Sequence, residues 1–235
     1  METKILEEFP RTKHLFNWSK SSDDDQFASL DISKEIFQTR VLVEEKIDGT
    51  NIGISVQNGI PMIRNRSKQI HLNERGRGTF QLAPIWNYCY ENIQKIEEIT
   101  ENGKLILFGD WLYVRHTVPY DSLPSFFISY SLFDRSRKEF LDKEDFLKRS
   151  AKTGFVSPTI RWHGKNLSET ILREMLKQRS SYVLKQNIAQ EGVVIYPLEG
   201  SLKGKWFKIV REDFEPGLYL TSQGSPILNE IIKPL

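Results

Sequence analysis

Alternating apolar and polar residues predict a chain rich in β-strands. Short apolar runs typical of strands occupy residues 41–46 and 51–56, and the turn formers Asp48 and Gly49 separate them. Asn58-Gly59 then lies between two apolar runs and predicts a β-hairpin, because both residues tolerate a positive φ. Four later runs have the same apolar character, and we expect strands at residues 104–110, 125–133, 191–196 and 205–210.

A different spacing predicts the helices. Apolar residues recur every three or four positions from Leu82 to Ile96, which forms one face of a helix of about four turns. Shorter helices are expected at residues 143–151 and 168–179, with Asp142 as the cap of the first. Many strands with few helices between them indicate an α+β fold, and the glycine motifs of Rossmann and P-loop nucleotide sites are absent.

Composition narrows the class of protein. The 235 residues carry 33 Lys and Arg against 31 Asp and Glu, and the net charge of +2 predicts no strong non-specific adhesion to nucleic acid but allows a local basic groove. A single cysteine, Cys89, excludes an internal disulfide framework and a cysteine-rich zinc site, and its place on the apolar helix face indicates a core residue. No apolar stretch has the length of a signal peptide or a membrane span, so we expect a cytoplasmic protein without a membrane partner. The most polar run, Ser19–Asp25, predicts an exposed loop.

Charged residues interrupt several of the apolar strands and are the candidates for chemistry. Lys46 and Asp110 each close a strand, Glu191 opens one, and Lys205 and Lys208 flank or lie within another. Desolvation lowers the pKa of a lysine and can expose a neutral amine nucleophile. Charges among buried strands are costly unless they are paired or bind metal or phosphate. Any one of them taken alone is equally explained by a structural salt bridge or an exposed turn lysine.

Taken together, these residues resemble a known family. Lys46-Ile-Asp-Gly matches the KxDG signature of covalent nucleotidyltransferases, the superfamily of ATP-dependent ligases and mRNA capping enzymes. The longer form Glu-Lys-Ile-Asp-Gly-Thr-Asn resembles the RNA ligase branch, particularly the group related to the second RNA ligase of phage T4. Four further blocks follow in the order of the family motifs and extend the resemblance to about residues 9–214: Phe108–Leu112, Phe126–Asp134, Glu191–Val194 and Lys205–Arg211.

The resemblance implies a fold and an activity. It implies one ATP-grasp-like adenylyltransferase domain over residues 1–235, an α+β nucleotidyltransferase fold of antiparallel sheets flanked by helices. Only 27 residues follow Lys208, too few for the OB-fold of DNA ligases and capping enzymes, so we expect a short C-terminal tail instead. The implied activity is an ATP-dependent RNA ligase that seals 5′-phosphate and 3′-OH ends through a lysyl-AMP intermediate and an RNA-adenylate. Its partners would be ATP, Mg²⁺ or Mn²⁺, RNA, and a protein that supplies extra RNA contacts.

Two other classes stay open at this point. The chain could be another KxDG enzyme, either a DNA ligase or a guanylyltransferase, or a non-catalytic module that binds nucleotide or RNA. Retention of Lys46, Glu191 and Lys208 argues against the non-catalytic module. RNA is favoured over DNA by the resemblance alone.

The resemblance also implies roles for the residues of the first three motif blocks. Lys46 is the nucleophile, and Glu45 lies beside the adenine edge unless it is an ordinary strand carboxylate. Asn51 faces the nucleotide or the metal-bound phosphate, and Asp110, where the family usually has Glu, lies near the ribose. Tyr130 stacks on the base where Phe is usual, and its alternative is a core residue.

Glu191 is the implied metal ligand, through water, since Mg²⁺ commonly keeps several waters and takes one or two carboxylates. The family also requires one arginine after the Asn58-Gly59 hairpin, and both Arg64 and Arg66 are present. Residues two apart on a strand share a face, so spacing does not separate them. We prefer Arg66, because Arg-Ser-Lys better resembles the family pattern.

The last motif usually has two lysines spaced by one residue. Here Lys208 is followed two positions later by a valine. Lys208 is therefore the first choice for the catalytic lysine of this motif. The second positive charge must come from Lys205 or Arg211.

Overall fold

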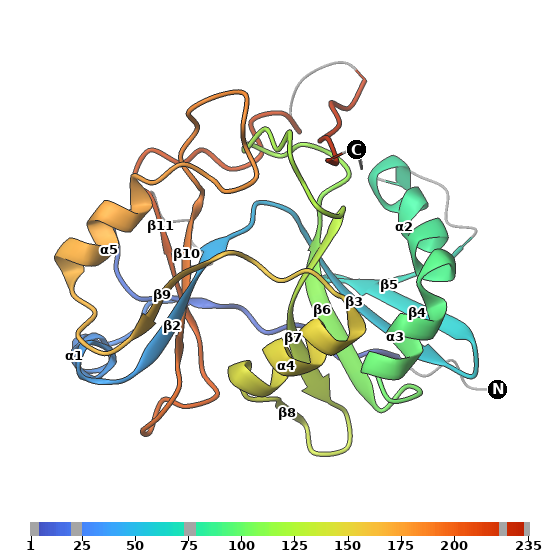
Figure 1. Cartoon of the computed structure of the whole chain (residues 1–235), viewed down its shortest axis with the longest axis horizontal. Coiled ribbons are helices and arrows are strands. Elements are labelled where there is room, and N and C mark those ends of the chain that lie inside the picture. The colour runs from blue at the N-terminus through green and yellow to red at the C-terminus, as the bar shows by residue number, and fades with distance from the viewer. Residues whose placement is uncertain (1–4, 20–24, 73–78, 221–224, 233–235) are drawn as a thin grey trace. The chain divides into compact units, whose positions relative to one another are not determined.

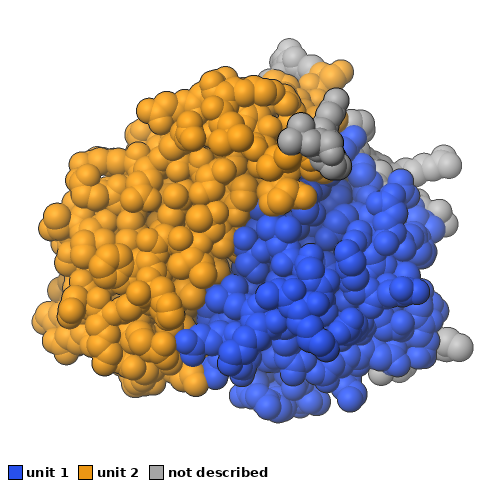
Figure 2. Space-filling view, viewed as in Figure 1, with its two compact units in different colours: residues 1–10, 49–114, 125–157 blue, residues 11–48, 115–124, 158–235 orange. Residues whose placement is uncertain are grey.

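The computed structural model describes residues 5–19, 25–72, 79–220 and 225–232, and residues 20–24 of the polar run expected to be a loop lie outside this part. The fold is α+β, with two β-sheets and helices, as the sequence predicts. The chain forms two compact units (Figure 2): residues 1–10, 49–114 and 125–157 make unit 1, and residues 11–48, 115–124 and 158–235 make unit 2. In the described residues, no helix has the length and apolar character needed to cross a membrane.

Unit 1 contains a six-stranded sheet in which every paired strand is antiparallel to its neighbour (Figure 1). Asn58 and Gly59 have φ values of 52° and 71°, so the expected hairpin is confirmed. The strands run across the sheet in the order β5 (Gln69–Ile70), β4 (Ile60–Asn65), β3 (Thr50–Gln57), β6 (Leu105–Trp111), β7 (Phe127–Asp134) and β8 (Glu139–Phe140).

The single helix expected from Leu82 to Ile96 is two helices, α2 (Thr79–Glu91) and α3 (Ile93–Ile99), which meet at Asn92. The apolar spacing continues through the break because both helices bury side chains in one core, so periodicity alone could not detect it. Helix α4 (Lys143–Thr153) begins after Asp142 as expected, but the Asp142 side chain makes no capping hydrogen bond.

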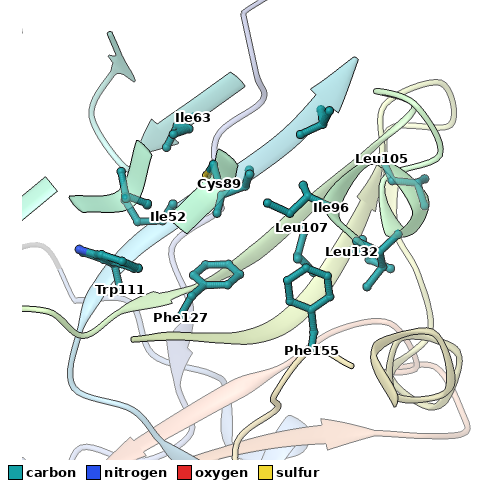
Figure 3. Packing of buried hydrophobic residues seen from close by; sticks show 14 of the residues in the cluster. Ile52, Ile63, Cys89, Ile96, Leu105, Leu107, Trp111, Phe127, Leu132 and Phe155 are labelled. Atoms are coloured by element: carbon teal, nitrogen blue, oxygen red, sulfur yellow. The ribbon is translucent and has the colours of Figure 1, made fainter. Parts of the chain in front are cut away.

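The core of unit 1 joins its sheet to α2, α3 and α4 (Figure 3). Cys89 is fully buried in it, which confirms a core role. Burial raises the pKa of the Cys89 thiol, so the thiol stays protonated and unreactive. The labelled side chains of Figure 3 are all apolar or sulfur-containing: Ile52, Ile63, Cys89, Ile96, Leu105, Leu107, Trp111, Phe127, Leu132 and Phe155.

The described residues of unit 2 form a five-stranded sheet and two helices, α1 (Leu30–Gln38) and α5 (Glu169–Leu176). Ser168 caps α5, because its hydroxyl accepts a hydrogen bond from the backbone N–H of Ile171. All pairs are antiparallel except β1 with β11. The strand order is β1 (Lys13–His14), β11 (Phe207–Val210), β10 (Gly192–Pro197), β2 (Val41–Lys46) and β9 (Ile160–Gly164).

The turn expected at Asp48-Gly49 does not close a hairpin. Strand β2 belongs to the sheet of unit 2, whereas β3 belongs to the sheet of unit 1. The two runs look like hairpin partners because they are short and close in sequence, but each pairs with strands far along the chain. Lys46 is therefore the last residue of β2, just before the chain leaves this sheet.

Candidate active site

The two faces of the sheet in unit 2 carry different residues. One face is apolar: Val43, Ile195 and Phe207 lie side by side on neighbouring strands and pack in a core with residues of α1 and α5. Successive side chains on a strand point to opposite faces, so Glu44 and Lys46 lie on the other face. The strand register adds His14, Val194 and Lys208 to this second face, which we call the lysine face of unit 2.

Lys46 and Glu191 form an ion pair at the end of β2. The Lys46 Nζ lies 2.7 Å from Glu191 Oε1, and the two side chains are 24% and 9% exposed. Gly192, which directly follows Glu191, lies opposite Lys46 of β2 on one side and Val210 of β11 on the other. A Cβ on Gly192 would lie 2.1 Å from the carbonyl oxygen of Ile209, so only glycine lets the strands approach here.

Lys208 lies on the lysine face, beside His14 in the strand register. Asp25 contacts both: its Oδ1 is 3.4 Å from Lys208 Nζ and 3.0 Å from His14 Nε2. Burial and then the charge of Lys46 lower the pKa of Lys208, and the carboxylates nearby oppose this shift. Burial also lowers the pKa of His14, followed by the charge of Lys208, so His14 is neutral near pH 7. The positive charges of Lys46 and Lys208 on this face suit the binding of phosphate.

Glu45 belongs to the opposite face, although it precedes Lys46 directly. Its carboxylate is fully buried and accepts hydrogen bonds from Arg161 Nη2 at 2.6 Å, Ser180 Oγ at 2.6 Å and the Ser181 N–H at 3.0 Å. Both oxygens of the Glu45 carboxylate are thus hydrogen-bonded within unit 2, as expected for a carboxylate with a structural role in the strand. A contact of Glu45 with adenine remains a prediction.

Asp48, the acidic residue of the KxDG block, holds a distant loop of unit 2. Its Oδ2 accepts hydrogen bonds from the backbone N–H groups of Thr117 at 2.7 Å and Val118 at 2.8 Å. Its own N–H donates to the hydroxyl of Tyr120 at 2.8 Å, and His116 Nδ1 lies 3.8 Å from its Oδ1. Asp48 therefore fixes the chain just after Lys46 to residues some 70 positions later.

In unit 1, Asn51 on β3 lies directly opposite Asp110 on β6. The register of β6 and β7 shifts between Phe108 and Gly109, which leaves Tyr130 as the extra residue of a β-bulge. The Asn51 amide donates a hydrogen bond to the Tyr130 hydroxyl. The rings of Phe9 and Tyr130 pack edge to face, with their centroids 5.3 Å apart. Burial raises the pKa of Tyr130, as does the charge of Asp110, so the hydroxyl stays protonated.

The two candidate arginines differ in burial. Arg64 is buried, and its guanidinium donates to three backbone carbonyls, those of Leu6, Asn65 and Arg66, at 2.6–3.0 Å. Arg66 is exposed and lies just beyond β4, in a turn that the Asn65 side chain closes through the N–H groups of Ser67 and Lys68. The preference for Arg66 stays a prediction, and this geometry favours it.

The two candidates for the second cation of the last motif lie outside β11. Lys205 is exposed and precedes the strand. It lies in a turn that is closed by a hydrogen bond from its backbone N–H to the Leu202 carbonyl. Arg211 follows the strand, and its guanidinium contacts the Gln190 carbonyl at 3.0 Å and Asp213 at 2.6 Å. The cation nearest in register to Lys208 on the lysine face is instead on β2, at Lys46.

The structure thus groups the predicted residues by unit. Lys46, Glu191 and Lys208 share one end of the sheet in unit 2, and Asn51, Asp110 and Tyr130 share neighbouring strands of unit 1. Sequence reasoning gave no role to four residues that contact these groups or flank them: His14, Asp25, Glu44 and Arg161. The signal for the first of them was the extent of the family resemblance, which begins at about residue 9 and so includes His14.

No described part of the chain gathers three or more His, Cys, Asp or Glu side chains in the arrangement of a protein metal cage. Mg²⁺ is commonly held by one or two carboxylates together with water and substrate phosphates. A single carboxylate beside two lysines, as at Glu191, fits that kind of site.

Comparison with known proteins agrees with this fold. A variant of the Naegleria gruberi RNA ligase with ATP and Mn matches with a TM-score of 0.62 and 17% identity, covering 88% of this chain and 59% of that one. The same ligase with PPi matches with a TM-score of 0.63 and 17% identity, covering 88% and 58%. An archaeal ATP-dependent RNA ligase matches with a TM-score of 0.57 and 17% identity, covering 88% and 48%.

These relatives are longer than the present chain, which spans less than three-fifths of the length of each of them. At this identity the likeness establishes the fold. A comparison with curated proteins gave no match. The family model described as RNA ligase matches residues 39–210, well over half of the chain and every motif from Lys46 to Lys208. The chain therefore belongs to the RNA ligase family.

Proposed function

We propose that this chain is an ATP-dependent RNA ligase that joins a 5′-phosphate to a 3′-OH through a lysyl-AMP intermediate and an RNA-adenylate. The observation that carries the proposal is the ion pair of Lys46 with Glu191, whose charged atoms are 2.7 Å apart. Lys46 ends β2, on the same face of the sheet as Lys208 of β11. A half-buried lysine beside a second lysine suits attack on a phosphate, because phosphoryl transfer depends mainly on positioning and charge neutralisation.

In the first step the neutral amine of Lys46 attacks the α-phosphorus of ATP. The Lys46 ammonium first gives up one proton to become that amine. A phosphorus–nitrogen bond then forms, the bond to the leaving oxygen of pyrophosphate breaks, and the nitrogen loses one further proton to solvent. The ion pair with Glu191 holds the amine in place beforehand and must open as the nucleotide arrives. Lys208 offsets the negative charge that builds on the phosphate oxygens. AMP then passes to the RNA 5′-phosphate, and the 3′-OH displaces it.

The residues of unit 1 are proposed to bind the nucleotide. Tyr130 offers a ring for the base, Asn51 and Asp110 offer polar groups beside it, and Arg66 offers a charge for phosphate. Support comes from the Asn51–Tyr130 hydrogen bond, which brings these two side chains together, and from the bulge that turns Tyr130 out of the regular strand alternation. Glu191 would hold Mg²⁺ or Mn²⁺, which neutralises phosphate charge when bound.

The test is covalent labelling of the protein. Incubation with radiolabelled ATP and Mg²⁺, followed by a denaturing gel, should label the wild-type chain, and intact mass should rise by one AMP. GTP should label it far less. Lys46→Ala should give no adduct, whereas Lys34→Ala, which removes an exposed lysine of α1, should label normally. A labelled Lys46→Ala protein would rule out this nucleophile.

The substrate is tested separately. The adenylylated wild-type chain should transfer AMP to an RNA strand with a 5′-phosphate and should seal it to a 3′-OH end. A DNA strand of the same sequence should be sealed more slowly. Equal sealing of DNA, or labelling by GTP in place of ATP, would assign the chain to another class of KxDG enzyme.

A further inference from the structure

Arg161 occupies an irregular position in the sheet of unit 2. Strand β9 pairs with β2 in a regular antiparallel register from Val41 to Val43, and the register then shifts so that Glu44 lies opposite Ile160. Arg161 is thus the extra residue of a β-bulge. Bulges next to active sites commonly redirect a side chain out of the alternation of the strand.

The redirected guanidinium joins two residues that flank the proposed catalytic pair. Arg161 Nη2 donates to Glu45 Oε2 at 2.6 Å, and Arg161 Nε donates to Gln190 Oε1 at 3.0 Å. Glu45 directly precedes Lys46, and Gln190 directly precedes Glu191. A single planar group therefore links the two chain segments that present the Lys46–Glu191 pair.

Both partners of Arg161 are themselves held on their remaining atoms. Ser180 donates to the second oxygen of Glu45 at 2.6 Å, and the Gln190 amide donates to the Met175 carbonyl at 2.8 Å. The Glu45 side chain is 0% exposed and that of Arg161 is 14% exposed. These bonds leave the guanidinium with one compatible position.

Stability is a weak explanation for this arrangement. The cost of desolvating a buried ion pair can exceed its Coulombic gain, and apolar residues of similar volume often stabilise a core as well or better. What the pair does supply is a defined geometry between β2 and the segment before β10. That geometry matters on the lysine face, where the amine must meet its target within fractions of an ångström.

We propose that Arg161 is a positioning residue for the Lys46–Glu191 pair and acts through Glu45 and Gln190. The proposal rests on the proposed function, in which Lys46 is the nucleophile. Because Lys46 follows Glu45 on the strand, a displacement of Glu45 is passed directly to the Lys46 backbone. Displacement of Gln190 moves Glu191 in the same way.

The test compares Arg161→Lys with Arg135→Lys. Lysine keeps the charge but cannot reach both Glu45 and Gln190 with one planar group. Arg135 is a matched control in unit 1, because its side chain is 15% exposed and it also pairs with a glutamate and donates to backbone carbonyls. In single-turnover experiments, Arg161→Lys should form lysyl-AMP about 10–100-fold more slowly, and Arg135→Lys should match the wild type. Both should lower the melting temperature by similar amounts.

A second readout does not depend on ATP. Lys46 is acetylated with a limiting amine-reactive reagent, and mass spectrometry compares its labelling with that of exposed Lys34. Arg161→Lys should raise labelling of Lys46 relative to Lys34, because the pair with Glu191 loosens, and Arg135→Lys should leave the ratio unchanged. If Arg161→Lys does not fold, Gln190→Met removes one acceptor at similar volume and is tested in the same way.

The outcomes separate the two proposals. A slow rate with raised Lys46 acetylation supports a positioning role for Arg161. Wild-type rate and unchanged acetylation in a folded variant overturn it, as does an equal loss of rate in Arg161→Lys and Arg135→Lys. If the wild-type chain forms no lysyl-AMP, the proposed function fails, and the acetylation ratio alone decides whether Arg161 positions Lys46.

Discussion

The ammonium of Lys46 lies 2.7 Å from the carboxylate of Glu191, and the two residues belong to strand segments that meet at Gly192. This contact has two consequences that experiments can separate. In the proposed reaction it would hold the amine in place before ATP binds, and it would keep a carboxylate where a divalent cation and phosphates gather.

Glu191→Gln keeps the shape of the side chain and removes its charge. We expect lysyl-AMP formation at fixed Mg²⁺ to slow by about two orders of magnitude or more, because both positioning and cation binding weaken. Mn²⁺ binding, followed by water proton relaxation, should weaken in the same variant. Glu199→Gln, which removes an exposed carboxylate paired with Lys165, is the control and should change neither quantity. Unchanged activity across a metal titration would exclude the metal role of Glu191.

Tyr130 is tested by two substitutions with different consequences. Tyr130→Phe keeps the ring but leaves the Asn51 amide without its acceptor, so the unfolding free energy should fall by about 1 kcal/mol while KM for ATP stays unchanged. Tyr130→Ala removes the ring and should raise KM by a factor that corresponds to about 1–3 kcal/mol, as for other aromatic residues that stack on bases. Melting temperature and KM are measured on the same preparations. A loss of stability with an unchanged KM would make Tyr130 a core residue only.

Alanine substitutions at Arg64 and Arg66 should have different effects on stability and activity. Arg64→Ala removes a buried guanidinium that satisfies three carbonyls, and should lower the unfolding free energy by about 3 kcal/mol. Arg66→Ala removes an exposed side chain and should leave the melting temperature unchanged while slowing lysyl-AMP formation. If Arg66→Ala has full activity, Arg64 becomes the candidate for the arginine of this motif.

His14 predicts how stability depends on pH. Burial lowers the pKa of folded His14 below its usual 6.5, so the unfolded chain binds a proton more readily as the pH falls. The unfolding free energy should therefore be full above about pH 6.5 and decline below it. Burial shifts the pKa of His116 in the same direction and adds to the slope. His14→Gln should flatten the pH dependence of the melting temperature, whereas the same change at exposed His163 should not. An unchanged slope in His14→Gln would contradict this assignment.

Gly192→Ala should be costly in both stability and activity. Its Cβ would lie 2.1 Å from the Ile209 carbonyl, so β10 and β11 must separate, at a cost of about 2 kcal/mol or more. Lys46 and Lys208 would then lose their register, and lysyl-AMP formation should slow. Gly59→Ala is the comparison: its Cβ meets no atom within 4 Å, so only its positive φ is strained, and activity should be retained.

Local patterns predicted the strands that carry the motifs, because those strands are short, apolar and bounded by turn residues. They did not predict β9 or α1. The sequence of β9, Ile-Arg-Trp-His-Gly, lacks a regular alternation because a bulge interrupts it at Arg161. In α1 only Ser33 and Ile36 are buried, so its apolar face is too narrow to identify by spacing.

Long-range contacts were the second limit. Asp48 looked like a turn residue, but its side chain is committed to the loop at Thr117 and Val118. Spacing could not separate Arg64 from Arg66, because residues two apart share a strand face. Their difference in burial appears only in the fold, where Arg64 is buried and Arg66 lies exposed beyond the end of β4. The contacts of Asp48 with Thr117 and of Arg64 with Leu6 both depend on segments far away in the sequence, and no local pattern carries that information.

The order Glu45-Lys46 also bears on how the chain finds its native pairing. A slip of one residue between β2 and β10 would exchange the two faces of β2. The ammonium would then be driven among Val193, Ile209 and their apolar neighbours, and the carboxylate would lose Arg161 and Ser180. The ammonium is then buried without a counter-ion, and Arg161 loses the carboxylate that it pairs with, at a cost of several kcal/mol. Two adjacent residues of opposite charge thereby penalise mispaired intermediates, and the register of Lys46 is selected during folding.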